Sequence, residues 1–244
     1  MVLLPYDNFF LPPLLFPNAI RPKCLYFLLL LIVAGGILTG ERAVLAFNGD
    51  RLRTAYLGYR ADNQEPLRAW QNMLQESHTV PVIEQLKRVN EFFNRRIRFD
   101  EDTQIWGQSD YWATPLETLA KGAGDCEDFA IAKYFSLLAL GIPAEQMRLI
   151  YVKARIGGPG SAIQQAHMVL AFYTAPDAEP QVLDNLITEI RPASRRPDLQ
   201  PVFSFNSNGI YAGAAANTTA GPGGTSRLSK WQDLLQRARN DGFE

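Results

Sequence analysis

The stretch 126–140 constrains the fold of this chain more than any other. Phe129 and Phe135 belong to a broad apolar face that repeats at helical spacing, and Gly141 and Pro143 follow as stop signals. A helix with so broad an apolar face must be covered on more than one side. The pattern therefore predicts a central helix that begins at Cys126 inside a globular domain.

Helical patterns precede this stretch and strand patterns follow it. Apolar residues at helical spacing predict helices over 65–77, 80–99 and 115–122, and the pattern over 48–62 is irregular. Segments typical of strands then cover 147–156, 165–174 and 180–187, with 201–212 as a candidate fourth. Helices followed by neighbouring strands predict an α+β domain, with N-terminal helices packed on an antiparallel β-sheet.

Residues 1–46 have the pattern of an export signal. Arg21 and Lys23 precede an apolar run of fourteen residues, Leu25 to Leu38, which is short for a membrane span of about 20 residues. Ala46 is an acceptable cleavage position. The segment is either a cleaved signal peptide or an uncleaved anchor, and both place the remainder outside the cytoplasm. We therefore expect an exported protein with a possible N-terminal membrane anchor.

The rest of the chain divides into three parts. We expect one domain over 47–211, a Gly/Ala-rich linker over 212–226 and an amphipathic helix over 227–244. Leu228, Trp231 and Leu234 lie on one side of that helix, which either packs on its own domain or docks elsewhere. The formal net charge is −1, so no overall basic excess indicates a nucleic-acid partner.

Three residues in order along the chain suggest nucleophilic catalysis. Cys126 is expected in the first turn of a helix, where backbone N–H groups favour a thiolate. His167 and Asp184 are expected on the next two strands, where adjacent side chains can share one face. A histidine there can take the thiol proton while the carboxylate fixes its tautomer. A turn position for Asp184 beside Asn185 stays open.

The other histidine and the acids around the cysteine have simpler explanations. His78 ends a helical stretch and reads as a surface or capping residue. Asp125 is a good N-cap residue, and Asp128 is placed to complete a capping box. Three carboxylates around Cys126 would oppose thiolate formation unless something positive offsets them. Both capping and a bound cation remain open for these acids.

The segments "DYWATPLETLAKGAGDCEDFAIAKYFSLLALGIP", "QAHMVLAFY" and "VLDN" resemble the bacterial transglutaminase-like cysteine proteinases, the LapG family. This family has the papain/transglutaminase-like fold with its catalytic cysteine at the start of a central helix. The resemblance covers about 70–211. It implies that Cys126 is the nucleophile, His167 the base and Asp184 the orienting residue. It also implies calcium (Ca²⁺) bound by Asp125 and Glu127.

The resemblance carries an expected biology as well. Enzymes of this family are periplasmic endopeptidases that cut a large repeat adhesin near its N-terminus, at a di-alanine, and so release cells from biofilms. An inner-membrane receptor that responds to cyclic di-GMP holds them inactive. Two alternatives remain: acyl transfer to an amine, as in transglutaminases, and a non-catalytic binding module in which Cys126 is structural.

The sequence leaves two details of the site open. Calcium takes six to eight oxygen ligands, so Asp102, Asp110, Asp128 and loop carbonyls are candidates beside the implied pair. The Cys126 N–H is a natural oxyanion donor at a helix start. A second donor is expected from the loop between Trp106 and Trp112, whose two indoles are alternatively apolar lids.

Overall fold

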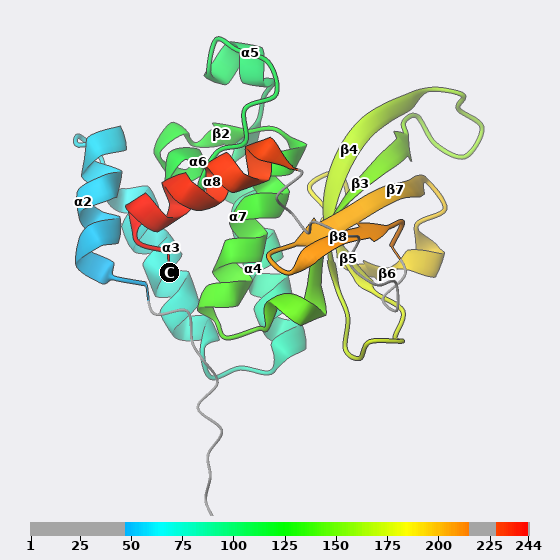
Figure 1. Cartoon of the computed structure of the whole chain (residues 1–244), viewed down its shortest axis with the longest axis horizontal. Coiled ribbons are helices and arrows are strands. Elements are labelled where there is room, and N and C mark those ends of the chain that lie inside the picture. Colours follow the sequence, from blue (N-terminus) through cyan, green and yellow to red (C-terminus); the bar gives the residue numbers. More distant parts are fainter. Residues whose placement is uncertain (1–46, 215–227, 244) are drawn as a thin grey trace, which may run out of the picture. The chain divides into compact units, whose positions relative to one another are not determined.

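The computed structural model describes residues 47–214 and 228–243. Helices come first along the chain and strands follow, with one last helix after them (Figure 1). The helices are α2 (Gly49–Tyr59), α3 (Glu65–Ser77), α4 (Val82–Arg96), α5 (Asp102–Ile105), α6 (Pro115–Lys121), α7 (Cys126–Ala139) and α8 (Ser229–Asp241). The strands are β1 (Arg98–Phe99), β2 (Ala123–Gly124), β3 (Met147–Arg155), β4 (Gln164–Phe172), β5 (Gln181–Leu183), β6 (Arg191–Pro192), β7 (Leu199–Asn206) and β8 (Gly209–Ala212). The predicted α+β class is confirmed.

The larger sheet is antiparallel throughout and has the order β6-β5-β4-β3-β7-β8. Strands β3 and β4 pair along their whole length, whereas β5 pairs with β4 only over 170–172. Leu149 and Leu170 face the main core that the helices share, and Ile150 and Val169 face a smaller apolar cluster on the other side. Side chains that alternate between faces therefore join the sheet to the helical layer.

Helix α7 is the centre of the domain. The sequence predicts one broad apolar face, and the structure buries eleven of the fourteen residues of α7, on nearly every side. Polar side chains inside this core have partners: the indole N–H of Trp70 donates to the hydroxyl of Ser136 at 2.8 Å. Helix α7 ends at Ala139 with Leu140 as its C-cap, and Gly141 follows with φ of 83°. A left-handed residue there favours glycine.

Helix α8 packs on its own domain, as one of the two alternatives expected. Trp231 is fully buried, and its ring centroid lies 5.3 Å from that of Phe205 and 5.8 Å from that of Tyr134. The side chain of Arg237 donates to the Glu117 carboxylate at 2.5 Å and to the carbonyl of Trp112 at 2.6 Å. The helix thus completes the aromatic core and also holds the segment before α6.

Several sequence expectations were wrong in detail. Residues 48–62 are not irregular, because Asn48 caps α2 and Leu52 and Tyr56 are buried against the domain. The helix expected over 80–99 stops at Arg96, and the next residues form β1. The segment between the helices expected over 80–99 and 115–122 contains the short helix α5, for which no pattern was identified. The candidate fourth strand is a hairpin of two strands, β7 and β8.

The described residues contain no helix that is long and apolar enough to cross a membrane. The segment 1–46, with its expected signal or anchor, lies outside the described residues. Most of the expected linker over 212–226 lies outside them too.

Candidate active site

Cys126 is the first residue of the buried helix α7. The chain reaches it through β2, which pairs in parallel with β1 and so fixes the entry to the helix. A Cβ atom on Gly124 would lie 2.7 Å from the Cβ of Asp128, so the close approach of these segments requires glycine. The thiol consequently sits at the positive end of a helix that the core holds rigidly.

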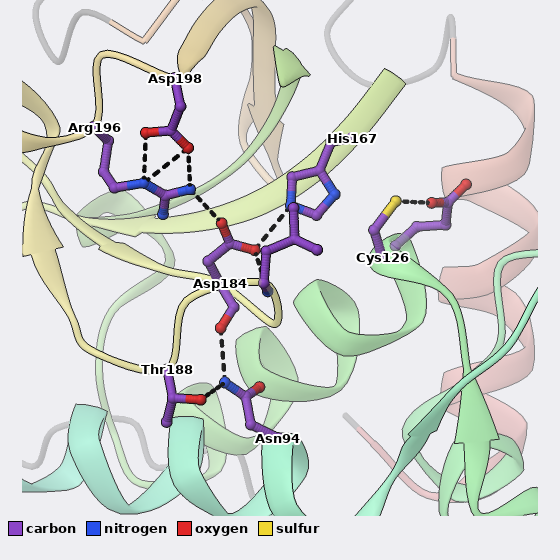
Figure 2. Close-up of polar contacts among 9 residues, drawn as sticks. Asn94, Cys126, His167, Asp184, Thr188, Arg196 and Asp198 are labelled. Carbon is purple, nitrogen blue, oxygen red and sulfur yellow. Dashed lines mark hydrogen bonds and ion pairs between the residues drawn. The ribbon is translucent and has the colours of Figure 1, made fainter. Parts of the chain in front are cut away.

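His167 and Asp184 meet as a buried pair beside this helix start. His167 lies on β4, and its Nε2 is 2.8 Å from Oδ1 of Asp184 (Figure 2). Asp184 follows the last residue of β5 and also accepts the N–H of Leu186 at 3.0 Å. The expected strand position of Asp184 was therefore wrong and the turn alternative is correct. The turn nevertheless brings Asp184 to His167.

The protonation state of this pair follows from its partners. Burial opposes the charge on Asp184, but the hydrogen bond and charge of His167, the Leu186 N–H and the Arg196 guanidinium outweigh it and lower the pKa of Asp184 to about 2. A carboxylate only accepts hydrogen bonds, so Nε2 of His167 donates to Asp184, and Nδ1 is the nitrogen that carries the lone pair when the ring is neutral. In Figure 2 the second ring nitrogen points to the side where Cys126 lies.

Sequence reasoning missed two residues that hold Asp184. Arg196 is buried, and its Nη2 lies 2.7 Å from Oδ2 of Asp184. The side-chain amide of Asn94, on α4, donates to the backbone carbonyl of Asp184 at 2.7 Å. Nothing local distinguishes Arg196 from the exposed Arg195 beside it, because its partner lies elsewhere in the fold.

Cys126 and His167 line one cavity of about 300 Å³, which β3, β4, the start of α7 and the segment 99–110 enclose. The Sγ atom of Cys126 lies 2.7 Å from Oε2 of Glu127. Burial first, and then the charge and hydrogen bond of Glu127 and the charge of Asp125, raise the pKa of the Cys126 thiol. These surroundings favour the thiol of Cys126 over the thiolate.

The acids beside the thiol form a cluster with unused ligand atoms. Oxygen atoms of Asp102, Asp125 and Asp128 lie within 4.8 Å of one another, as do ligand atoms of Asp125, Cys126 and Glu127. Within the described part of the chain, Oδ1 of Asp102 and Oδ1 of Asp125 are buried without a hydrogen-bond partner. Buried carboxylate oxygens are costly when unpaired, and they are the ligands that calcium prefers. The residues therefore fit a calcium ion.

The pKa shifts in this cluster agree with that fit. Burial, followed by the charges of Glu127, Asp128 and Asp102, raises the pKa of Asp125 to about 9. Burial also raises the pKa of Asp102 to about 6. Asp128 is different, because its oxygens accept the N–H groups of Ala113 and Asp125 at 2.8 and 3.4 Å. The expected capping role of Asp128 is confirmed.

The other residues considered from the sequence lie at the edge of the cavity, in the core or at the surface. From the loop before Trp112, Ser109 and Asp110 line the cavity, whereas neither tryptophan does. The Trp112 ring stacks on Phe205 in the core, with centroids 5.6 Å apart. Asp110 also forms an ion pair with Lys230 of α8. His78 is exposed at the C-terminal end of α3, as expected of a surface or capping residue.

Comparison with known proteins places this site in a family. The family described as bacterial transglutaminase-like cysteine proteinase matches residues 54–197. A structure of LapG from Legionella pneumophila is 38% identical, with 78% of this chain and 96% of that chain covered and a TM-score of 0.64. A search of the curated proteins finds no match.

Two further structures of the Legionella pneumophila protein are a calcium-bound form and an EGTA-treated form. The calcium-bound form is 40% identical, with 77% of this chain and 97% of that chain covered and a TM-score of 0.64. The EGTA-treated form is 38% identical, with 78% and 96% covered and a TM-score of 0.66. On the family match and this identity over most of its length, the chain belongs to the bacterial transglutaminase-like cysteine proteinases and is a cysteine protease.

Proposed function

We propose that this protein is a calcium-dependent endopeptidase whose catalytic residues are Cys126, His167 and Asp184. One observation carries the assignment. A histidine oriented by a buried carboxylate shares a cavity with the thiol at the start of a helix. This combination supplies a nucleophile, a base and a residue that orients the base.

The side chains define each step of peptide cleavage. Nδ1 of His167 takes the thiol proton, and Sγ of Cys126 attacks the carbonyl carbon of the scissile bond. The Cys126 N–H, at the helix start, stabilises the negative charge on the carbonyl oxygen. The C–N bond then breaks, and His167 returns the proton to the leaving amine. Water hydrolyses the thioester, which releases the carboxylic acid and restores the thiol.

The calcium ion is assigned to Asp125 and Glu127, with Asp102 as a third ligand. The unpartnered oxygens of Asp102 and Asp125 support this choice. When bound, calcium would supply two positive charges beside the thiol, and the Glu127 carboxylate would serve as its ligand in place of the present contact with Sγ of Cys126. The calcium-bound and EGTA-treated forms of the Legionella pneumophila protein support calcium as the physiological cation.

The substrate and the setting are proposed from the family resemblance. We assign as substrate a large repeat adhesin, cut at a di-alanine near its N-terminus, with control of biofilm attachment as the outcome. The enzyme would act in the periplasm under an inner-membrane receptor that responds to cyclic di-GMP. The export-type pattern over 1–46 supports that location.

Cleavage of an adhesin N-terminal fragment tests the function directly. Wild type should cut it in calcium and lose activity in EGTA, and added calcium should restore the activity. Cys126→Ala should abolish cleavage and keep the wild-type circular dichroism spectrum. Cys24→Ser is the matched control, because it removes the chain's other cysteine and should cleave normally. Cleavage by Cys126→Ala at the wild-type rate would refute the assignment.

The two alternative activities have their own readouts. A glutamine peptide offered with a labelled amine would yield labelled product without hydrolysis if the enzyme were a transglutaminase. A thiol-alkylating reagent should modify Cys126 faster in calcium than in EGTA. Equal, slow modification in both conditions would favour a structural cysteine and a binding module.

A further inference from the structure

A buried ion-pair chain continues from the His167–Asp184 pair into the fold. Arg196 is 2% exposed, and its Nη2 donates to Oδ2 of Asp184 at 2.7 Å. The same guanidinium contacts both carboxylate oxygens of Asp198, with Nε–Oδ1 at 3.0 Å and Nη2–Oδ2 at 2.7 Å (Figure 2). Four groups thus lie in a row: Asp198, Arg196, Asp184 and His167.

The chemistry of this row suits an orienting role. The Asp184 carboxylate rotates about a single bond unless both oxygens are held. Arg196 holds Oδ2, so Oδ1 faces His167 and the Leu186 N–H. A guanidinium is a rigid plane of donors, so binding Asp198 through Nε and Nη2 fixes the direction in which Nη2 also donates to Asp184.

The backbone of Asp184 is secured by different residues. Asn94 donates to the Asp184 carbonyl at 2.7 Å, and Asn90 donates to the Thr188 carbonyl at 2.8 Å. Both asparagines come from α4, which does not carry Arg196. Loss of the guanidinium would therefore free the carboxylate of Asp184 while its main chain stays in place.

A second buried cation lies near the same carboxylate. Lys133, on α7, is fully buried, and burial lowers its pKa to about 7 against the opposing charge of Asp184. An amine that loses its charge near neutral pH is a poor counter-ion. The guanidinium of Arg196 stays charged, because its hydrogen bonds to Asp198 and Asp184 outweigh burial and raise its pKa.

We infer that Arg196, anchored by Asp198, is a positioning residue that aims the Asp184 carboxylate at His167. This inference rests on the proposed function, because it assigns Arg196 a part in the triad. It differs from a purely structural ion pair in one respect. It requires that loss of Arg196 alters the His167–Asp184 hydrogen bond. It also requires that this loss slows the chemical step more than it weakens substrate binding.

Arg196→Met tests this with a side chain of similar length. We expect kcat on the adhesin fragment to fall about 100-fold with KM changed less than about twofold, because a misplaced base slows chemistry and not binding. Arg196→Lys keeps the charge and loses the fork, so it should recover only part of the loss. Arg191→Met is the matched control. Arg191 pairs with Glu189 at 2.6 Å in the same region but is 39% exposed.

Proton NMR gives a readout that needs no substrate. The chain has only two histidines, and the ring N–H of the exposed His78 exchanges rapidly with water, so a persistent imidazole N–H signal is that of Nε2–H of His167. We expect that signal to be sharp and downfield in wild type and in Arg191→Met, and to broaden or move upfield in Arg196→Met. If Arg196→Met fails to fold, Asp198→Asn carries the test, since Asp198 is 32% exposed and its loss should move the same signal.

The outcomes separate the two proposals. An unchanged His167 signal, or equal kcat in Arg196→Met and Arg191→Met, would overturn the role of Arg196. If wild type cleaves no fragment while the NMR signal responds as expected, the proposed activity fails and the positioning of Asp184 by Arg196 stands.

Discussion

The two sides of the catalytic cavity differ in how fully their charges are paired. On one side, Asp184 has donors on both carboxylate oxygens, from His167, Leu186 and Arg196. On the other side, Asp102 and Asp125 each keep a buried oxygen without a partner. Burial acts on both groups of acids, yet the pKa falls to about 2 for Asp184 and rises to about 9 for Asp125.

In the proposed function, this difference separates a preformed half of the site from a half that a cation would complete. The base and its orienting residue are complete in the folded chain. The nucleophile is not, because its thiol contacts the carboxylate of Glu127. Under the proposed function, calcium would add charge to a site whose geometry is already formed. The predictions below break each half in turn.

The largest effect should come from Asp184→Asn. An amide presents a donor as well as an acceptor, so it no longer enforces the Nε2–H tautomer of His167, and kcat should fall about 10⁴-fold. The rise in melting temperature on adding calcium should persist, because the acid cluster is untouched. Thermal melts with and without calcium, beside cleavage rates, check both statements. A fall in kcat of less than about tenfold would contradict the role of Asp184.

Asp125→Asn should disrupt the other half of the site, which contains the acid cluster. Cleavage in calcium should drop about 10- to 100-fold, and the calcium-induced rise in melting temperature should disappear. In EGTA at neutral pH the variant should melt about 2–4 °C higher than wild type, because the Asp125 carboxyl, with its pKa raised to about 9, must take up a proton on folding and an amide need not. Asp110→Asn is the control, since Asp110 lines the same cavity but is 58% exposed. A variant that keeps its calcium response would exclude Asp125 as a ligand.

Low pH should weaken the half of the site that contains His167 and Asp184, within a defined pH range. The pKa of Asp184 is depressed from 3.8 to about 2, so its stabilisation is fully present above about pH 4 and is lost as pH falls towards 2. The shift corresponds to about 2 kcal/mol of unfolding free energy. Urea unfolding across that window should show this loss in wild type and not in Asp184→Asn. A parallel pH dependence in both proteins would mean that Asp184 is not depressed.

The smallest effect should come from Asn94→Ala. It removes the hydrogen bond to the Asp184 carbonyl, which should cost about 1 kcal/mol of stability and lower kcat by about threefold. Thr188→Val is the comparison, because it removes only the weaker 3.3 Å contact of Asn94 with the Thr188 hydroxyl. Urea unfolding and steady-state rates measure both variants, and the alanine variant should show the larger change.

Periodicity predicts the long elements of this fold and misses the short ones. Helices α4 and α7 have stripes of apolar residues long enough to identify. In α2 only Leu52 and Tyr56 are buried, so its sequence shows too little periodicity to stand out. Strands β1 and β2 have two residues each, and their pairing depends on a contact that no local pattern encodes.

The residues of the site likewise fall into those that the sequence predicts and those that only the fold reveals. Cys126, His167 and Asp184 could be named because their order and neighbours match a family. The supports of Asp184 could not, because Arg196 is 12 residues away and Asn94 is 90 residues away from it in the chain. Asp102 was one of several candidate acids. Only the fold brings it beside Asp125 and leaves an oxygen of each without a donor.

The position of helix α8 bears on when the enzyme matures during synthesis. The cysteine helix and every strand of the sheet are made before Ser229. Until Trp231 docks against Phe205, the centre of the aromatic core stays open, and the segment before α6 lacks its contact with Arg237. We expect a nascent chain without α8 to be loosely packed and to cleave its substrate slowly. A protease completed by its latest helix is restrained while it is still being made.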